Sequence, residues 1–299
     1  MRKYVETFME NQFFPADARE ELISVYDKIM ADDALCDILC RAIDLYENDI
    51  TCDYDEVLAL CEELEESSLI HEYMVNLIFC ICLTFHLKDR YNKAGIGQDV
   101  WSDTVSELKY KMIECKDRTN IWGIKDKESL RNIFEMKCFT LGRLQFEPAK
   151  FGDIVPSMEY DVNGTKITSD TKDIKVLVPR MLRQLDSELL EESYAMAKDF
   201  FADEFTGMPM TLVCKSWMLY PEFAGVGYGT DIKSFSDGFE LAAVSDDAEG
   251  EYPDMVEVFD MEFTGRAEDY PENTMLRKHF KEYLINGGKT GRGIGIKIL

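Results

Sequence analysis

The sequence predicts an α+β protein in which an all-helical domain, residues 1–137, precedes a mixed-sheet α/β domain, residues 138–299. Two observations lead to this prediction. Until about residue 134, apolar residues recur at three- and four-residue steps, which is the spacing of amphipathic helices. From Phe139 onwards they alternate with polar residues or form short β-branched runs, as strands do. A chain of 299 residues is also long enough for two domains.

The composition is that of a folded, strongly acidic protein. Hydrophobic residues make up 46% of the chain, charged residues 30%, and the formal net charge is -25. This charge repels phosphate backbones and anionic lipid, so the sequence argues against nucleic acid and membrane surfaces as partners. The nine cysteines are an odd number, and several lie among apolar residues at helical spacing. They indicate reduced core residues and predict a cytoplasmic protein.

The helical domain contains several apolar stripes with acidic residues on the remaining faces. We expect helices over Leu22–Met30, Leu35–Tyr46, Val57–Leu64 and Val105–Ile113. The most apolar stretch, Met74–Leu87, is shorter than the roughly 20 residues that span a bilayer, and polar residues interrupt it. We therefore expect it to form the central buried helix. The first residues lack the apolar core of a secretory signal, so we expect no export.

The second domain begins with a strand-like segment, Phe139–Glu147, which we expect to end at Pro148. Asn163 and Gly164 favour a tight turn in a hairpin over Tyr160–Ile167. Further strands are expected at 240–244 and 255–263, a helix at 274–285, and a thin, glycine-rich edge strand that ends at residue 299.

One unit of the second domain bears directly on function. Ile174–Pro179 is a β-branched run ended by proline, a helix begins after Asp186 as its N-cap, and Thr211–Leu219 is the next strand. Parallel strands joined by a crossover helix form a βαβ unit, and ligands usually bind at the carboxyl end of its first strand. We expect both strands in the centre of the sheet and a ligand near the turn between them.

Metal and nucleotide motifs are not evident. Cys36 and Cys40 share an apolar helix face and Cys80 and Cys82 point apart, so neither pair has the spacing of a zinc site. The segment Gly287–Thr290 ends like a P-loop but lacks the spaced glycine and the preceding strand. We expect no metal ion and no nucleotide hydrolysis.

Three blocks of the sequence carry a resemblance to a known family. Leu141–Glu147, Cys214–Leu219 and Tyr270–Thr274 with the following Gly287-Gly288 resemble a bacterial family of acyltransferase-domain proteins. That family joins an N-terminal helical domain to a C-terminal domain similar to the GNAT N-acyltransferases, and the resemblance covers nearly the whole chain. It implies a GNAT-like second domain that transfers an acyl group from acyl-CoA to an amine, with CoA or acyl-CoA as co-substrate. The alternative is a non-catalytic binding or regulatory protein that keeps the fold.

The resemblance also implies a donor site. Ile174–Pro179 would line the acyl-CoA cleft, and Arg180–Asp186 would be the pyrophosphate loop that leads into a helix. The family's loop usually contains spaced glycines, whereas this loop contains Arg180 and Arg183 and no glycine. The two guanidinium groups would then bind the phosphates. Otherwise they are simply two solvated arginines at the start of a helix.

The same plan suggests residues for the cleft wall and for proton transfer. Ser216 and Trp217 would line the cleft, Tyr220 or Tyr228 would protonate the leaving thiolate, and Glu147 would be the base. Each also has a purely structural interpretation: Trp217 as core, Tyr220 as a strand end and Glu147 as solvent-facing.

Two positions depart from the pattern that the family implies. Phe235 lies where a catalytic tyrosine would be wanted, and Leu177 lies where relatives carry a histidine. In addition, residues 277–297 form a basic segment in an acidic chain. This segment would bind the phosphates of CoA or, as we favour, pair with acidic helices of the first domain.

Overall fold

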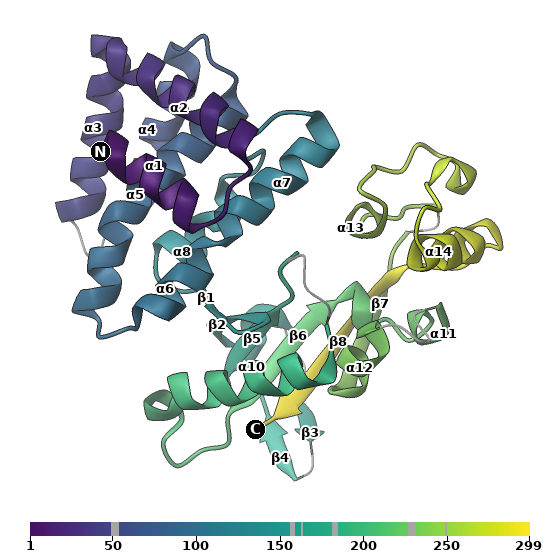
Figure 1. Ribbon diagram of the computed structural model, residues 1–299. Helices are drawn as coiled ribbons and strands as arrows, with labels where there is room; N and C mark the ends of the chain where they lie inside the picture. The colour runs from purple at the N-terminus through teal and green to yellow at the C-terminus, as the bar shows by residue number, and fades with distance from the viewer. Residues whose placement is uncertain (49–53, 156–158, 163, 181–184, 227–230, 249) are drawn as a thin grey trace. The chain divides into compact units, whose positions relative to one another are not determined.

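The computed structural model describes residues 1–48, 54–155, 159–162, 164–180, 185–226, 231–248 and 250–299. The chain forms two compact units, Met1–Thr140 and Leu141–Leu299. The described part of the first unit is helical until the strand that begins at Phe139, and the second unit is built on a mixed sheet (Figure 1). The predicted α+β class is therefore confirmed.

The helical unit consists of helices packed around one long central helix, α5. Its helices are α1 (Arg2–Asn11), α2 (Ala16–Ala31), α3 (Asp33–Asn48), α4 (Tyr54–Ser67), α5 (Glu72–Lys93), α6 (Gln98–Val105), α7 (Glu107–Thr119) and α8 (Arg131–Phe134).

Helix α5 contains the apolar stretch for which the sequence predicts a buried central helix, and most of its residues are buried. The polar interruption at Asn76 is satisfied inside the core, because its Nδ2 donates to the carbonyl of Ile124 at 3.1 Å and its Oδ1 accepts from the Cys61 thiol at 3.4 Å. The helix ends before Gly95, which has a φ of 73°. In the ranges that the structure describes, no helix is both long enough and apolar enough to cross a membrane.

The second unit contains a six-stranded sheet in the order β1-β2-β5-β6-β8-β7 and a separate hairpin, β3-β4. The strands are β1 (Phe139–Leu141), β2 (Leu144–Lys150), β3 (Tyr160–Val162), β4 (Thr165–Ile167), β5 (Lys172–Leu177), β6 (Thr211–Ser216), β7 (Glu240–Asp246) and β8 (Gly291–Ile298). The helices are α9 (Phe151–Ile154), α10 (Ser187–Phe200), α11 (Phe223–Val226), α12 (Asp231–Asp237), α13 (Met255–Phe259) and α14 (Met275–Ile285). Strands β5 and β6 are parallel and central, as predicted, and α10 connects them.

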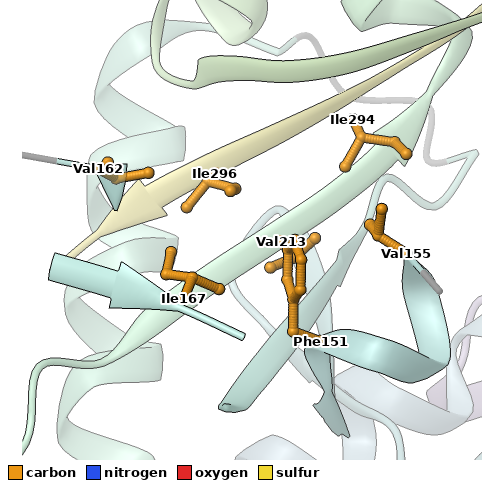
Figure 2. Close-up of a cluster of buried hydrophobic side chains, with 7 residues drawn as sticks. All are labelled: Phe151, Val155, Val162, Ile167, Val213, Ile294 and Ile296. Atoms are coloured by element: carbon orange, nitrogen blue, oxygen red, sulfur yellow. The ribbon is translucent and has the colours of Figure 1, made fainter. Parts of the chain in front are cut away.

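The two faces of the sheet are covered by different elements. On one face, Val213 of β6 and Ile294 and Ile296 of β8 pack against α9 and the β3-β4 hairpin, as Figure 2 shows. On the other face, Lys297 of β8 lies 4.6 Å from the ring centroid of Tyr194 on α10. Helix α10 therefore covers the face opposite the hairpin (Figure 1).

A carboxyl group is buried at the start of β5. Asp173 is fully inaccessible to solvent, and neither of its carboxyl oxygens has a hydrogen-bond partner in the described structure. Burial, together with the nearby charge of Asp153 on α9, raises the pKa of Asp173 to about 7. The fold therefore favours the protonated form of this side chain.

Three of the predicted elements are wrong in detail. Residues 255–263 do not form a strand, because Met255, Val258 and Phe259 are buried at helical spacing in α13. Pro148 lies inside β2 and does not end it. The predicted strand 211–219 stops at Ser216, whose Oγ accepts a hydrogen bond from the backbone N–H of Met218 at 3.2 Å and so starts a 3₁₀ turn.

The glycine-rich segment is an interior strand and not the predicted edge. Strand β8 lies between β6 and β7 and pairs with both along its length. A Cβ at Gly293 would collide with the carbonyl of Leu219, and one at Gly295 would lie 2.7 Å from Cβ of Phe239. The glycines therefore allow neighbouring segments to pack directly on the strand.

Candidate functional site

The central strands β5 and β6 separate towards their carboxyl ends. Their parallel register joins Ile174 to Leu212 and Lys175 to Val213, whereas β5 continues to Leu177 and β6 to Ser216. Both strands are held to their ends by their outer neighbours, since Leu177 pairs with β2 and Ser216 pairs with β8. The opening is thus a built feature of the sheet. Beyond Lys175 and Val213 the register gives no pairing between the inner edges of the two strands, and an extended ligand with amide groups can bridge such edges.

The turn after β5 is braced by the first of the three sequence blocks. The backbone N–H of Arg143 donates to Ser193 Oγ of α10 at 2.7 Å, and its Nη1 donates to the carbonyl of Pro179 at 2.9 Å. Gly142 has a φ of 70°, and a Cβ there would lie 2.7 Å from Ser193 Oγ. The Leu-Gly-Arg block therefore fixes the position at which the chain leaves the opening. Sequence reasoning singled out this block but missed the role of Arg143.

Arg180, the predicted phosphate-binding residue, is ion-paired in this structure. Its Nη1 lies 2.5 Å from Asp260 Oδ1, and Asp260 also pairs with Arg277 of α14. Asp260 follows α13 in the left-handed conformation, with a φ of 58°. Because Asp260 is 80 positions from Arg180, no sequence pattern could have suggested the pair. Arg183, the second predicted phosphate ligand, lies outside the described residues.

The start of α10 carries negative charge. Asp186 Oδ1 accepts a hydrogen bond from the backbone N–H of Leu189 at 2.9 Å, and Glu188 lies in the first turn. This confirms the predicted N-cap. It also means that a carboxylate already occupies one of the backbone donors that would otherwise face an anion.

Several cations of the basic segment pair with carboxylates of their own unit, whereas we expected partners on the acidic helices of the first domain. Arg292 binds both carboxylate oxygens of Asp254, at 2.5 and 2.6 Å, and Lys297 lies 3.6 Å from Glu191. These pairs tie β8 to α10 and to the segment that precedes α13. Arg292 and Lys297 therefore stabilise the packing of the second unit.

Ser216 and Trp217 follow the end of β6 beside the opening. Ser216 Oγ caps the 3₁₀ turn. Trp217 is buried, its Nε1 donates to Glu257 Oε2 at 2.8 Å, and its ring meets those of Phe223 and Phe280 edge to face. Trp217 thus belongs to the core beneath this turn, and Ser216 is the more accessible of the two.

Tyr220 and Glu147 lie at separate places. The buried hydroxyl of Tyr220 donates to Asp246 Oδ1 at 3.0 Å, and burial, with this carboxylate, raises the pKa of Tyr220 to about 12. Glu147 of β2 is buried and not solvent-facing, and Lys175 Nζ lies 2.7 Å from its Oε2. Since Lys175 is also in register with Val213, the pair lies where β5 and β6 begin to separate. Tyr228 lies outside the described residues.

A hollow of about 140 Å³ lies beyond the end of β6. Its apolar walls are Met218, Leu219, Pro221, Phe239 and Leu241. Tyr220, Ser236 of α12 and Gly295 of β8 complete the lining. Sequence reasoning missed this hollow, because its walls come from three separate segments of the chain, 218–221, 236–241 and Gly295. Within the described residues, no three potential metal ligands converge.

Two family models together match nearly the whole chain. The model of a GNAT-like C-terminal domain matches residues 138–297, and that of an N-acyltransferase N-terminal domain matches residues 4–136. No curated protein sequence matches the chain at a significant level.

Solved structures share the fold over almost the whole chain. An acyltransferase in complex with decanoyl-CoA and teicoplanin is 17% identical, with a TM-score of 0.72 over 97% of this chain and 86% of that chain. An acyltransferase mutant in complex with octanoyl-CoA is 17% identical, with a TM-score of 0.74 over 99% and 88%. An acyltransferase in complex with decanoyl-CoA is 18% identical, with a TM-score of 0.73 over 97% and 86%.

Proposed function

Because the chain belongs to the family of proteins with a GNAT-like C-terminal domain, we propose that it transfers an acyl group from acyl-CoA to an amine. The observation that carries this proposal is the opening between β5 and β6. The pantetheine arm of CoA is an extended chain with two amides, and it would pair with the inner strand edges as an added strand does. The complexes of similar acyltransferases with CoA esters support this choice of donor.

The chemistry requires little of the protein beyond positioning and one base. The amine nitrogen attacks the thioester carbonyl, the new C–N bond forms, the C–S bond breaks, and the nitrogen loses a proton. We assign this proton to Glu147, which Lys175 holds at the start of the opening. A positioned carboxylate of this kind contributes about 10²–10⁴-fold.

The departing thiolate needs only weak acid assistance, since the pKa of a thiol is about 8.5. A phenol whose pKa is raised to about 12 by burial, as in Tyr220, transfers its proton to such a thiolate unfavourably. Between the two predicted tyrosines we therefore propose Tyr228 as the acid. Tyr220 would hold the segment after β6 through Asp246.

Phosphate binding is assigned to Arg180 and Arg183, with Ser216 on the wall of the cleft and Trp217 packed behind it. Arg180 would exchange Asp260 for the pyrophosphate, while Asp260 keeps its second partner, Arg277. This exchange costs little because the Arg180 side chain is more than one third exposed to solvent.

A titration with CoA and a turnover assay test the proposal. CoA should raise the melting temperature with a dependence on concentration that follows mass action. Acetyl-CoA and a panel of primary amines should release free thiol, measured with a chromogenic disulfide. Absence of both CoA binding and thiol release would reject the function.

A non-catalytic, CoA-binding or regulatory protein remains the second candidate. The carboxylates of Asp186 and Glu188 at the start of α10 favour it, because they repel a pyrophosphate at that helix end. Binding of CoA without thiol release from any acyl-CoA and amine pair would select this candidate. The described cysteines are all free, which supports a cytoplasmic location for either function.

A further inference from the structure

We propose that the hollow beyond β6 receives the distal carbons of a straight acyl chain, up to about six of them, and so selects the donor by chain length. This inference rests on the proposed function. It adds a chemical class of ligand, an aliphatic acyl group, and the residues that recognise it.

The position of the hollow suits the far end of a bound acyl group. Met218 and Leu219 form its walls and lie two and three residues after Ser216, the last residue of β6. Ser216 borders the opening that would hold the pantetheine arm. A chain attached to a thioester in that opening can therefore turn along the 3₁₀ turn into the hollow.

The side-chain donors of the lining are already used. Among its described members, the hydroxyl of Tyr220 donates to Asp246, and that of Ser236 donates to the carbonyl of Lys233 at 3.0 Å. A ligand group that accepts hydrogen bonds from water would lose them without a side-chain donor to replace them, at a cost of about 1–3 kcal/mol for each group. An aliphatic chain loses none.

The floor of the hollow is closed and its mouth is accessible. At Gly295 a Cβ would lie 2.7 Å from Cβ of Phe239 and 2.9 Å from Cδ1 of Leu219, so these side chains already rest against the strand. Leu241 on β7 also lines the hollow and is 46% exposed, which places it at the mouth. Because the floor cannot recede without moving the sheet, the depth limits the chain that fits.

The volume sets the number of carbons. An apolar cavity of about 150 Å³ in another protein binds benzene, a molecule of six carbons. The hollow here measures about 140 Å³. It therefore takes about six carbons of a linear chain, and further carbons must remain outside.

Isothermal titration of the full chain with CoA and with acetyl-, butyryl-, hexanoyl-, octanoyl- and decanoyl-CoA tests the inference. Affinity should rise by up to about fourfold for each methylene that enters the hollow and should level off when it is full. Ser236→Leu should fill the hollow. The ratio of the affinity for the best acyl-CoA to the affinity for acetyl-CoA should then fall at least tenfold, while the affinity for CoA itself stays unchanged. Ser234→Leu is the matched control, since Ser234 is on the same helix but exposed.

A second pair of variants changes the mouth. In Leu241→Ala, affinity should level off only at longer or branched acyl chains. Val244→Ala, at an exposed position on the same strand, should not change the chain length at which affinity levels off. This pair keeps the test decisive if leucine at position 236 prevents folding.

The outcomes separate the inference from the proposed function. If neither CoA nor any ester binds, the proposed function is wrong and the inference falls with it. If CoA binds but affinity is independent of chain length, the hollow does not hold the acyl chain, although the function stands. The same conclusion follows if each variant behaves like its control.

Discussion

Between acidic and alkaline pH, the free energy of unfolding of the second unit should fall less in the Asp173→Asn variant than in the native chain. Asp173 is buried without a hydrogen-bond partner, and burial with the charge of Asp153 raises its pKa from 3.8 to about 7. The folded state therefore binds this proton more tightly than the unfolded state. As the pH rises, the contribution of Asp173 to the free energy of unfolding falls from about pH 4 and is fully lost above about pH 7.

The size of the effect follows from the shift. About three pKa units at 1.36 kcal/mol each give about 4 kcal/mol as an upper bound on the stability lost between pH 4 and pH 8. Asparagine cannot ionise and avoids this loss. Its buried amide has its own cost of about 1–3 kcal/mol at every pH, so the measured quantity is the difference between the two pH values.

Urea unfolding at pH 4 and pH 8 measures this difference. Replacement of Trp101 and Trp122 by phenylalanine leaves Trp217 as the single tryptophan of the chain, and its fluorescence then reports on the second unit. Asp170→Asn is the control, because Asp170 is exposed close to Asp173 in the sequence. If native chain and Asp173→Asn lose stability in parallel between the two pH values, Asp173 is not protonated in the fold and the reasoning fails.

Three further outcomes are expected. Arg180→Ala combined with Arg183→Ala should weaken CoA binding by about 1–3 kcal/mol, and more at low salt, as measured by calorimetry; unchanged affinity would move the phosphate site elsewhere. Tyr228→Phe should lower turnover by about 10² with donor affinity intact, whereas Tyr220→Phe should mainly lower the melting temperature; equal turnover losses would contradict the assignment. Arg143→Met should reduce both stability and CoA affinity, because the brace after β5 is lost; a variant with native CoA affinity would show that the brace does not shape the opening.

The sequence sufficed to predict those parts of the fold in which local pattern and packing agree. Ile174 and Val176 are β-branched and buried on one face of a central strand, so this short run was recognisable from composition. Met255, Val258 and Phe259 have helical spacing, but the run is too short for the period to exclude a strand. Alternate glycines in β8 indicate close packing on one face, and only the structure shows that the turn after β6 and Phe239 provide it.

The candidate site was predictable only in outline. The βαβ unit places Arg180 and Ser216 at the carboxyl ends of the two central strands, and the structure agrees. The partners that decide their roles come from distant segments, as Asp260 does for Arg180 and Glu257 for Trp217. Long-range pairing of this kind leaves no periodic signal in the sequence. The sequence could therefore suggest site residues but not their interaction partners.

The position of β8 also orders events during synthesis. Strand β7 pairs with the sheet only through β8, and β6 uses β8 as its outer neighbour. On the ribosome, residues up to 290 can emerge while β6 and β7 still expose unpaired backbone edges. Such edges bind other strands readily, so the second unit is open to aggregation until residues 291–298 join the sheet.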